Sequence, residues 1–278
     1  MYKNHIINVL RIKIYLIYKL ISPFETASYH QKMLPMNKLW NYRIRRTHRF
    51  MGVILGVQFL FWTLGGLYFS WSNMDEIHGD FQKKAPPQYR TDFDFISPKI
   101  ALSNLKTKQN IDSVLSLNLI DVLGKPTYRI EYLHGGHHKM YQLADALTGN
   151  LRDPLSKNEA LALAKQQFNG EPNIKSIEYL TDVNGHHEYR ENALPAYAVT
   201  FEHETATTVY VATEMGIVTK YRNTKWRIFD FLWMLHTMDY QSRDNLGNGL
   251  LRAFSIFGLL TILSGFTLYF ISSKRFKK

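Results

Sequence analysis

The sequence predicts an α+β membrane protein in which two transmembrane helices flank a domain of two helix-plus-antiparallel-sheet repeats. Two stretches, residues 51–71 and 253–273, each run 21 residues without a charged side chain. Crossing a hydrocarbon core about 30 Å thick takes roughly 20 such residues in a helix. The third observation is that one pattern, a helix followed by strands, occurs twice between these stretches.

Basic residues crowd the two ends of the chain. Residues 1–50 hold ten Lys or Arg against one Glu, and residues 274–278 add four more without an acid. Residues 72–250, by contrast, carry 19 basic and 22 acidic side chains. Since loops rich in Lys and Arg stay on the cytoplasmic side, we expect both termini in the cytoplasm and the central domain on the far side. The same distribution argues against a nucleic-acid-binding domain, which would concentrate basic residues on its folded part.

Residues 1–36 are predicted to be an N-terminal extension outside the fold. The stretch from His5 to Ile21 is apolar, but three basic residues interrupt it and make a spanning helix costly. An amphipathic helix at the membrane surface and a dispensable extension both agree with this pattern. A cytoplasmic basic segment, residues 37–50, then leads into the first span.

The segment between the spans begins with a connector, residues 72–94, and continues with two similar repeats, residues 95–154 and 155–225. Ser97-Pro98 and Ser156 each open an apolar helical pattern with a capping residue, and Glu159 completes a capping box. Each helix is followed by alternating strand patterns and a turn with Gly. These patterns are 128–132, 140–144 and 145–151 in the first repeat, and 197–201, 209–213 and 213–218 in the second. Repeats of about 60 residues are only marginally stable alone, so we expect them to share a hydrophobic core or to pack against the membrane helices.

The segment 226–250 is predicted to be interfacial. It places apolar residues at helical spacing, with Ile228, Phe231, Leu232 and Leu235 on one side. We therefore expect an amphipathic helix that lies on the membrane or docks under the repeats. The second transmembrane helix, 251–273, and a cytoplasmic basic tail, 274–278, complete the chain.

Several motifs resemble those of a known family. The helix that begins at Ser156, the strand Tyr197–Phe201 and the turn Asp145–Gly149 resemble the PepSY domain. The flanks are similar to the PepSY-associated transmembrane helix family. Those flanks are Arg45–Gly52 before the first span, Leu235–Asp239 and Asn245–Arg252 before the second, and Ser264–Tyr269 within it. Two departures are Thr213-Glu214-Met215, where an Asp-x-x-Thr would stand, and two spans where some relatives have four or more.

The resemblance implies a location and two kinds of function. It implies a protein of the bacterial inner membrane with a periplasmic central domain. Relatives take part in iron and siderophore uptake, some as haem-bearing reductases of ferric complexes, and PepSY domains elsewhere are linked with restraining peptidases. We therefore expect an accessory or electron-transfer component of iron uptake. The alternatives are a non-catalytic module that binds a peptide or peptidase, and a scaffold subunit of a membrane complex.

Three histidines near the membrane are the candidate ligands of a haem b, a cofactor that the resemblance to haem-bearing relatives implies for some members of the family. His48 and His236 each lie next to apolar residues that could surround a haem ring. They belong to opposite interfaces, about 30 Å apart, so one iron would not take both. His78 lies on the same side as His236 and forms a feasible pair with it. The other interpretation is that these histidines are interfacial residues like the neighbouring Trp and Tyr.

Two further histidine clusters are candidate metal sites. His134, His137 and His138 lie in one polar connection, and His186 and His187 lie in another. Imidazole groups bind Zn, Cu and Fe, whereas thiolate ligands are excluded because the chain has no Cys. The alternative is an ordinary solvated loop in each case, since no HExxH-type spacing is present.

The spans also carry small residues that favour helix association. Gly52 and Gly56 have the spacing at which two helices can approach closely. We expect pairing through this face within the chain, in a homodimer or with other membrane subunits, in addition to contact with the lipid bilayer.

Overall fold

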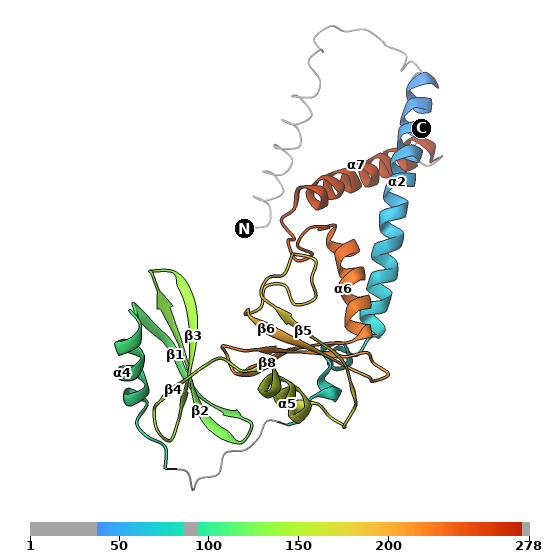
Figure 1. Ribbon diagram of the computed structural model, residues 1–278. Helices are drawn as coiled ribbons and strands as arrows, with labels where there is room; N and C mark the ends of the chain where they lie inside the picture. The colour runs from blue at the N-terminus through green and yellow to red at the C-terminus, as the bar shows by residue number, and fades with distance from the viewer. Residues whose placement is uncertain (1–37, 86–93, 274–278) are drawn as a thin grey trace, which may run out of the picture. The chain divides into compact units, whose positions relative to one another are not determined.

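The computed structural model describes residues 38–85 and 94–273, as drawn in Figure 1. The predicted N-terminal extension, residues 1–36, and the predicted basic tail, residues 274–278, lie outside the described residues. What was predicted for these two segments stays a prediction.

Two helices, α2 (Lys38–Trp71) and α7 (Gly249–Ser272), are long and apolar enough to cross a membrane. Only 11% of the most apolar stretch of α2 and none of that of α7 is buried. Such exposure is unlike that of a core helix in a soluble protein and agrees with contact with lipid. Helix α2 begins at Lys38, so the predicted basic segment 37–50 is largely the first part of the same helix.

The first repeat consists of a helix and a four-stranded antiparallel sheet in the order β1-β2-β3-β4. Its elements are α4 (Pro98–Lys108), β1 (Ser113–Val122), β2 (Lys125–His134), β3 (His138–Asp145) and β4 (Leu151–Arg152). The Ser97 side chain accepts a hydrogen bond from the Lys99 backbone N–H and caps α4, as predicted. Ala101 and Leu105 of α4 pack against Ile130 of β2. The helix therefore covers one face of the sheet (Figure 1).

The second repeat has the same order of elements. They are α5 (Lys157–Gln167), β5 (Ile174–Leu180), β6 (Ala196–Phe201), β7 (Thr208–Ala212) and β8 (Ile217–Arg222), and the sheet order is β5-β6-β7-β8. Ser156 and Glu159 form the predicted capping box, in which each side chain accepts a hydrogen bond from the other residue's backbone N–H. Leu163 of α5 packs with Val199 and Val209 of the sheet.

The first strand of each sheet was not predicted. In β5 the partly buried Ile174 and Ile177 are three residues apart, because a bulge lies between Ile174 and Ser176. Strand β1 has a similar irregularity between Val114 and Ser116. A bulge adds one residue and breaks the period of two by which a strand is read from sequence.

The two repeats share one of their buried hydrophobic clusters, as expected from their small size. Val122 and Leu143 of the first sheet belong to the same buried cluster as Leu163 and Phe168 of the second repeat. The β7–β8 turn makes a close contact, since a Cβ added to Gly216 would lie 3.0 Å from a Leu143 methyl group. Gly216 also has a φ of +68°, which favours glycine.

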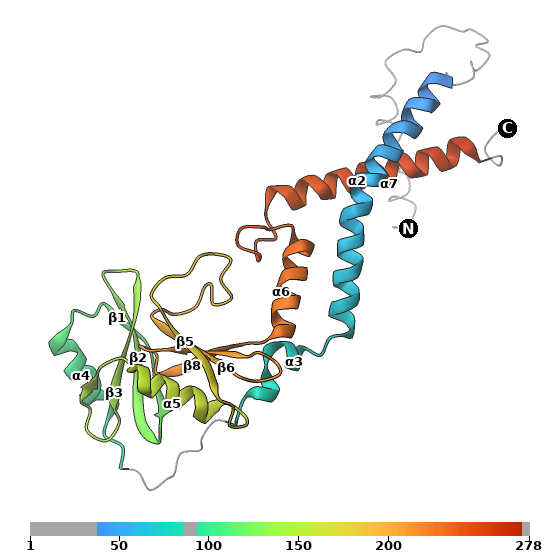
Figure 2. The same cartoon turned by 45° about the vertical axis from the view of Figure 1, so that its right-hand side comes forward.

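Helix α6 (Thr224–Thr237) runs beside α2 in both views (Figures 1 and 2). The Gln58 side chain donates a hydrogen bond to the Leu235 carbonyl at 2.9 Å, and the Trp62 indole donates one to the His236 carbonyl at 2.8 Å. The predicted amphipathic segment 226–250 therefore contains a helix that docks on α2.

The short elements α3 (Met74–His78) and η1 (Asp80–Gln82) follow α2.

The small-residue face of α2 that was expected to pair with another helix is open. Apart from its chain neighbours and the nearby backbone of α2 itself, a Cβ added to Gly52 or Gly56 would meet no described atom within 4 Å. Helix α2 approaches α6 closely at Gly65 instead, where an added Cβ would lie 3.8 Å from a backbone oxygen of α6. Pairing between chains through Gly52 and Gly56 stays a prediction.

Candidate functional site

The second sheet has two differently built faces. Alternate residues of β6 face α5 or the opposite side, and Ala198 and Thr200 face the opposite side. The long β5–β6 loop, residues 181–195, and α6 lie over this face. Tyr189 of the loop is fully buried there, with its ring stacked at 4.5 Å on that of Tyr210.

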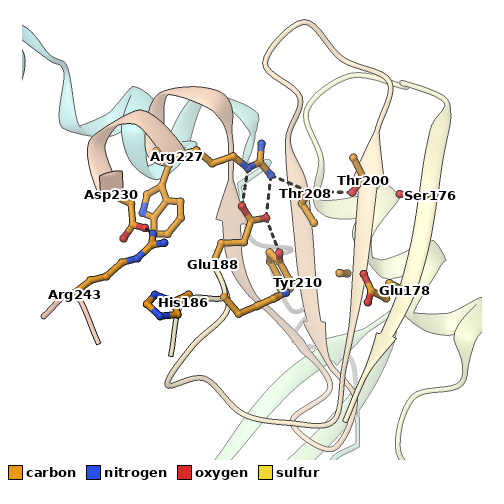
Figure 3. Close-up of a pocket in the computed structure, with 13 residues that line it drawn as sticks. Ser176, Glu178, His186, Glu188, Thr200, Thr208, Tyr210, Arg227, Asp230 and Arg243 are labelled. Carbon is orange, nitrogen blue, oxygen red and sulfur yellow. Dashed lines mark hydrogen bonds and ion pairs between the residues drawn. The ribbon is translucent and has the colours of Figure 1, made fainter. Parts of the chain in front are cut away.

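A pocket of about 430 Å³ remains on this face, and that volume lies in the range of small-ligand sites. Three strands, the β5–β6 loop, α6 and the segment before α7 contribute to it (Figure 3). Its lining residues are Ser176, Glu178, His186, His187, Glu188, Ala198, Thr200, Thr208, Tyr210, Trp226, Arg227, Asp230 and Arg243. The cross-strand neighbours Ser176, Thr200 and Thr208 have small side chains, which leave space above the sheet.

Glu188 is the centre of one charged cluster in the pocket. Arg227 of α6 donates two hydrogen bonds to its carboxylate, from Nε at 2.6 Å and from Nη2 at 2.9 Å, and the Tyr210 hydroxyl donates a third at 2.6 Å. Burial raises the pKa of Tyr210, and the Glu188 carboxylate raises it further. Tyr210 is therefore a neutral donor, and the Glu188 carboxylate is occupied by partners from its own chain.

Asp230 is the centre of a second charged cluster. Its carboxylate is only 4% exposed and accepts a hydrogen bond from Arg190 at 2.7 Å and another from Arg243. Arg190 also donates to Asp244 at 3.1 Å. The cluster therefore ties the β5–β6 loop, α6 and the segment before α7 together. Within the described chain, the Nε atoms of Arg190 and Arg243 are buried and have no hydrogen-bond partner.

The pocket opens at the free edge of the second sheet. Strand β5 is an edge strand of this sheet, and no described strand pairs with its outer side. Ser176 and Glu178 of β5 line the pocket, and both are exposed. The backbone groups of an edge strand can pair with an added strand. The charged side chains of Lys175 and Glu178 are of the kind that discourages two such edges from pairing with each other.

The two predicted metal clusters lie in separate repeats. His134, His137 and His138 belong to the β2–β3 hairpin, where all three are exposed. His186 and His187 belong to the β5–β6 loop and line the pocket. In the part of the chain that the structure describes, no group of three or more His, Asp or Glu could hold a metal ion. Metal binding at either cluster stays a prediction from sequence.

The predicted haem ligands His48 and His236 have separate surroundings. The His48 Nδ1 lies 2.8 Å from the Ser264 hydroxyl of α7. The His236 ring stacks on Trp233 with 6.2 Å between centroids and lies 6.0 Å from the Trp62 ring. Its Nδ1 is buried and, among the described residues, has no hydrogen-bond partner. Trp62 and Trp233 therefore give the His236 imidazole an aromatic surrounding.

His78 is not brought together with His236. His78 is the last residue of α3, and its neighbour Glu76 forms an ion pair with Lys225 in the first turn of α6. His236 lies in the last turn of the same 14-residue helix. At about 1.5 Å of rise per residue, the two ends of that helix are about 20 Å apart. The structure therefore gives no support for one iron between these two histidines.

Comparisons with protein-family models, with curated proteins and with solved structures gave no match. The resemblance to the PepSY family therefore stays a prediction.

The charged residues that form the pocket were not predicted from the sequence. A signal was available for two of them, since Arg227 and Asp230 interrupt the aromatic run of α6 and are three residues apart, on the same side of the helix. Glu188 and Arg243 lie in irregular segments. They meet their partners only through the tertiary fold, so no local pattern marks them.

Proposed function

We propose that the chain is a membrane-anchored binding module whose second repeat holds a polypeptide segment in the pocket beside β5. The observation that carries the proposal is that the pocket opens directly onto a free strand edge, at Ser176 and Glu178. A bound segment can pair its backbone with β5 and place its side chains in the pocket. Glu188 and Arg227 are already bonded to each other, which suits a preformed binding surface.

The module is proposed to lie on the periplasmic side of a bacterial inner membrane, with both chain termini in the cytoplasm. The charge distribution along the chain and the two apolar helices support this placement.

The test uses the full chain in lipid nanodiscs and a mixture of synthetic ten-residue peptides of random sequence. We expect the wild-type chain to retain a subset of these peptides. Ser176→Trp places an indole at the mouth of the pocket and should abolish retention. Lys175→Trp changes a residue of the same strand that does not line the pocket, and should leave retention intact. Equal retention by wild type, Ser176→Trp and empty nanodiscs would contradict the proposal.

A second candidate function is electron transfer or an accessory role in iron or siderophore uptake, with haem b bound at His236. The buried Nδ1 without a partner and the aromatic shell of Trp62 and Trp233 favour it. Bound haem would supply one-electron chemistry, while the chain would hold the imidazole by ring stacking and by the bond from Trp62 to the His236 carbonyl.

The absorption spectrum of the full chain, purified from cells supplied with haem, tests this second function. A Soret band that His236→Ala removes without lowering membrane abundance would support it. If His236 is only an interfacial residue, His236→Gln should be silent, because Gln keeps a polar tip. No Soret band in the parent chain would contradict haem binding.

A further inference from the structure

Glu178 differs from the other charged side chains that line the pocket. Glu188 pairs with Arg227, and Asp230 pairs with Arg243. The Glu178 carboxylate has no such partner among the described residues, and Figure 3 shows it at the edge of the sheet, away from both pairs. Glu178 is also exposed. The lining charge without a counter-ion is therefore a carboxylate that a ligand can reach.

The second sheet itself gives Glu178 no partner. Its neighbour across the strand pair is Ala198 of β6, whose side chain has no polar atom. Directly opposed residues of two strands have Cβ atoms about 4.5 to 5.5 Å apart, so a cross-strand neighbour is well placed to pair with a charge. On the outer side of β5, where no described strand lies, an added strand would place one of its side chains next to this carboxylate.

The other face of the same edge is apolar. Because side chains alternate along a strand, Ile177 and Tyr179 lie on the side of the sheet that α5 covers, and Ile177 packs against the core cluster there. Tyr179 packs against Tyr197 of β6, with 4.7 Å between ring centroids, yet 50% of Tyr179 is exposed. An added strand would therefore meet an apolar surface on this face and a carboxylate on the other.

A second copy of β5 does not complement this edge. Directly opposed residues of paired strands share a face, and the residues of β5 on the face of Glu178 are Ser176, Leu180 and Glu178 itself. None of them is basic, and like charges in direct opposition destabilise a sheet. Lys175 is the extra residue of the bulge and lies outside this alternation. Charge complementarity therefore favours a different polypeptide with a basic side chain.

We propose, on the basis of the proposed function, that β5 selects an extended segment in which basic and apolar side chains alternate. A Lys or Arg of the segment lies opposite Glu178 at the mouth of the pocket. The apolar side chains on either side of it lie beside Ile177 and Tyr179, on the other face of the sheet. Backbone pairing along β5 supplies affinity, and the side-chain contacts supply the choice of sequence. Glu178 is thus the residue that determines specificity at this edge.

The test uses three fluorescent ten-residue peptides, titrated with the full chain in nanodiscs of zwitterionic lipid. Lys and Val alternate over the six central residues of the first peptide, Glu replaces each Lys in the second, and the third groups the same Lys and Val residues into two blocks. We expect the first to bind about fivefold more tightly than the second, because an opposite-charge pair replaces a like-charge pair. The third should bind more weakly than the first, because its Lys block also places charges on the apolar face.

Two charge-reversal variants separate the edge of β5 from the overall charge of the chain. Glu178→Lys should reverse the preference, so that the Glu peptide binds more tightly than the alternating Lys peptide. Glu171→Lys makes the same change at an exposed carboxylate outside the pocket and should leave the wild-type preference in place. Reversal by both variants would mean that overall charge selects the peptide, which would overturn the proposal.

The outcomes also separate this inference from the function on which it rests. If the alternating Lys peptide binds the wild-type chain no better than either of the other two, the inference is overturned and peptide binding stays in place. If these peptides and the random peptides all fail to bind, both proposals are overturned. A chain that dimerises in micelles, and that Ser176→Trp makes monomeric, would assign this edge to a second copy and would overturn the inference as well.

Discussion

Asp230 offers the sharpest test of how the site is held together. Its carboxylate is 4% exposed and lies between Arg190 and Arg243, whose side chains are 10% and 20% exposed. Asp230→Asn keeps the shape of the side chain but removes its charge. Two largely buried guanidinium groups then lose their shared counter-ion.

The expected loss follows from the burial of these groups. Removing one partner of a buried ion pair costs about 3 to 5 kcal/mol, because an unpaired charge remains. Asp244 still accepts a bond from Arg190, and Arg243 is one-fifth exposed, so we expect about 3 kcal/mol. For a domain of this size, about 2 to 4 °C of melting temperature corresponds to each kcal/mol, which gives a fall of about 6 to 12 °C.

Thermal unfolding of the full chain in detergent micelles, followed by tryptophan fluorescence, measures this loss. Glu171→Gln makes the same chemical change at an exposed position and is the matched control. Adding Arg243→Gln to Asp230→Asn should recover part of the loss, because one unpaired cation is removed. If Asp230→Asn unfolds within about 1 °C of Glu171→Gln, the ion cluster does not stabilise the site and this reasoning is wrong.

Three further predictions address the core, the helix pair and the loop before α7. Gly216→Ala should lower the melting temperature more than Gly124→Ala does, because both have positive φ but only Gly216 contacts the other repeat; equal shifts would argue against a shared core. Gln58→Leu leaves the Leu235 carbonyl without its donor and should cost about 1 to 3 kcal/mol in the same assay, so no change would mean that α6 does not depend on α2. A bond from the Ser242 hydroxyl and three from backbone N–H groups lower the pKa of Asp239 from 3.8 to about 2. The ionised Asp239 therefore stabilises the fold fully above about pH 4, and this stabilisation is lost as the pH falls through 2. Asp239→Asn should remove the loss of stability between these two pH values from an acid-unfolding curve.

The parts of the fold that depend on local chemistry could be predicted from the sequence. The two uncharged stretches of 21 residues predict the apolar parts of α2 and α7, since a helix needs roughly 20 such residues to cross a hydrocarbon core about 30 Å thick. Ser156 and Glu159 predict the start of α5 because a capping box needs only four consecutive residues. Strand β5 escaped prediction because its bulge breaks the alternation on which the prediction depends.

The candidate site could be predicted only in small part. The loop histidines His186 and His187 were singled out and do line the pocket, although the reason given was metal binding, which stays untested. The bonds that shape the pocket join residues far apart in the chain, such as Glu188 to Arg227 and Arg190 to Asp230. Such pairs depend on how α6 packs against the sheet, and no periodic pattern in the sequence records that packing.

Site-specific photocrosslinking in cells can detect a polypeptide bound in the pocket beside β5. A photoreactive amino acid replaces Glu178 of β5 in the full chain. In a matched control it replaces Asn118, an exposed residue of β1, an edge strand of the first sheet, and Asn118 lines no part of this pocket. We expect a crosslinked adduct from position 178 that proteases degrade, none from position 118, and loss of the adduct when Ser176→Trp blocks the pocket. Equal adducts from both positions, or an adduct at 178 that Ser176→Trp leaves unchanged, would contradict the proposed function.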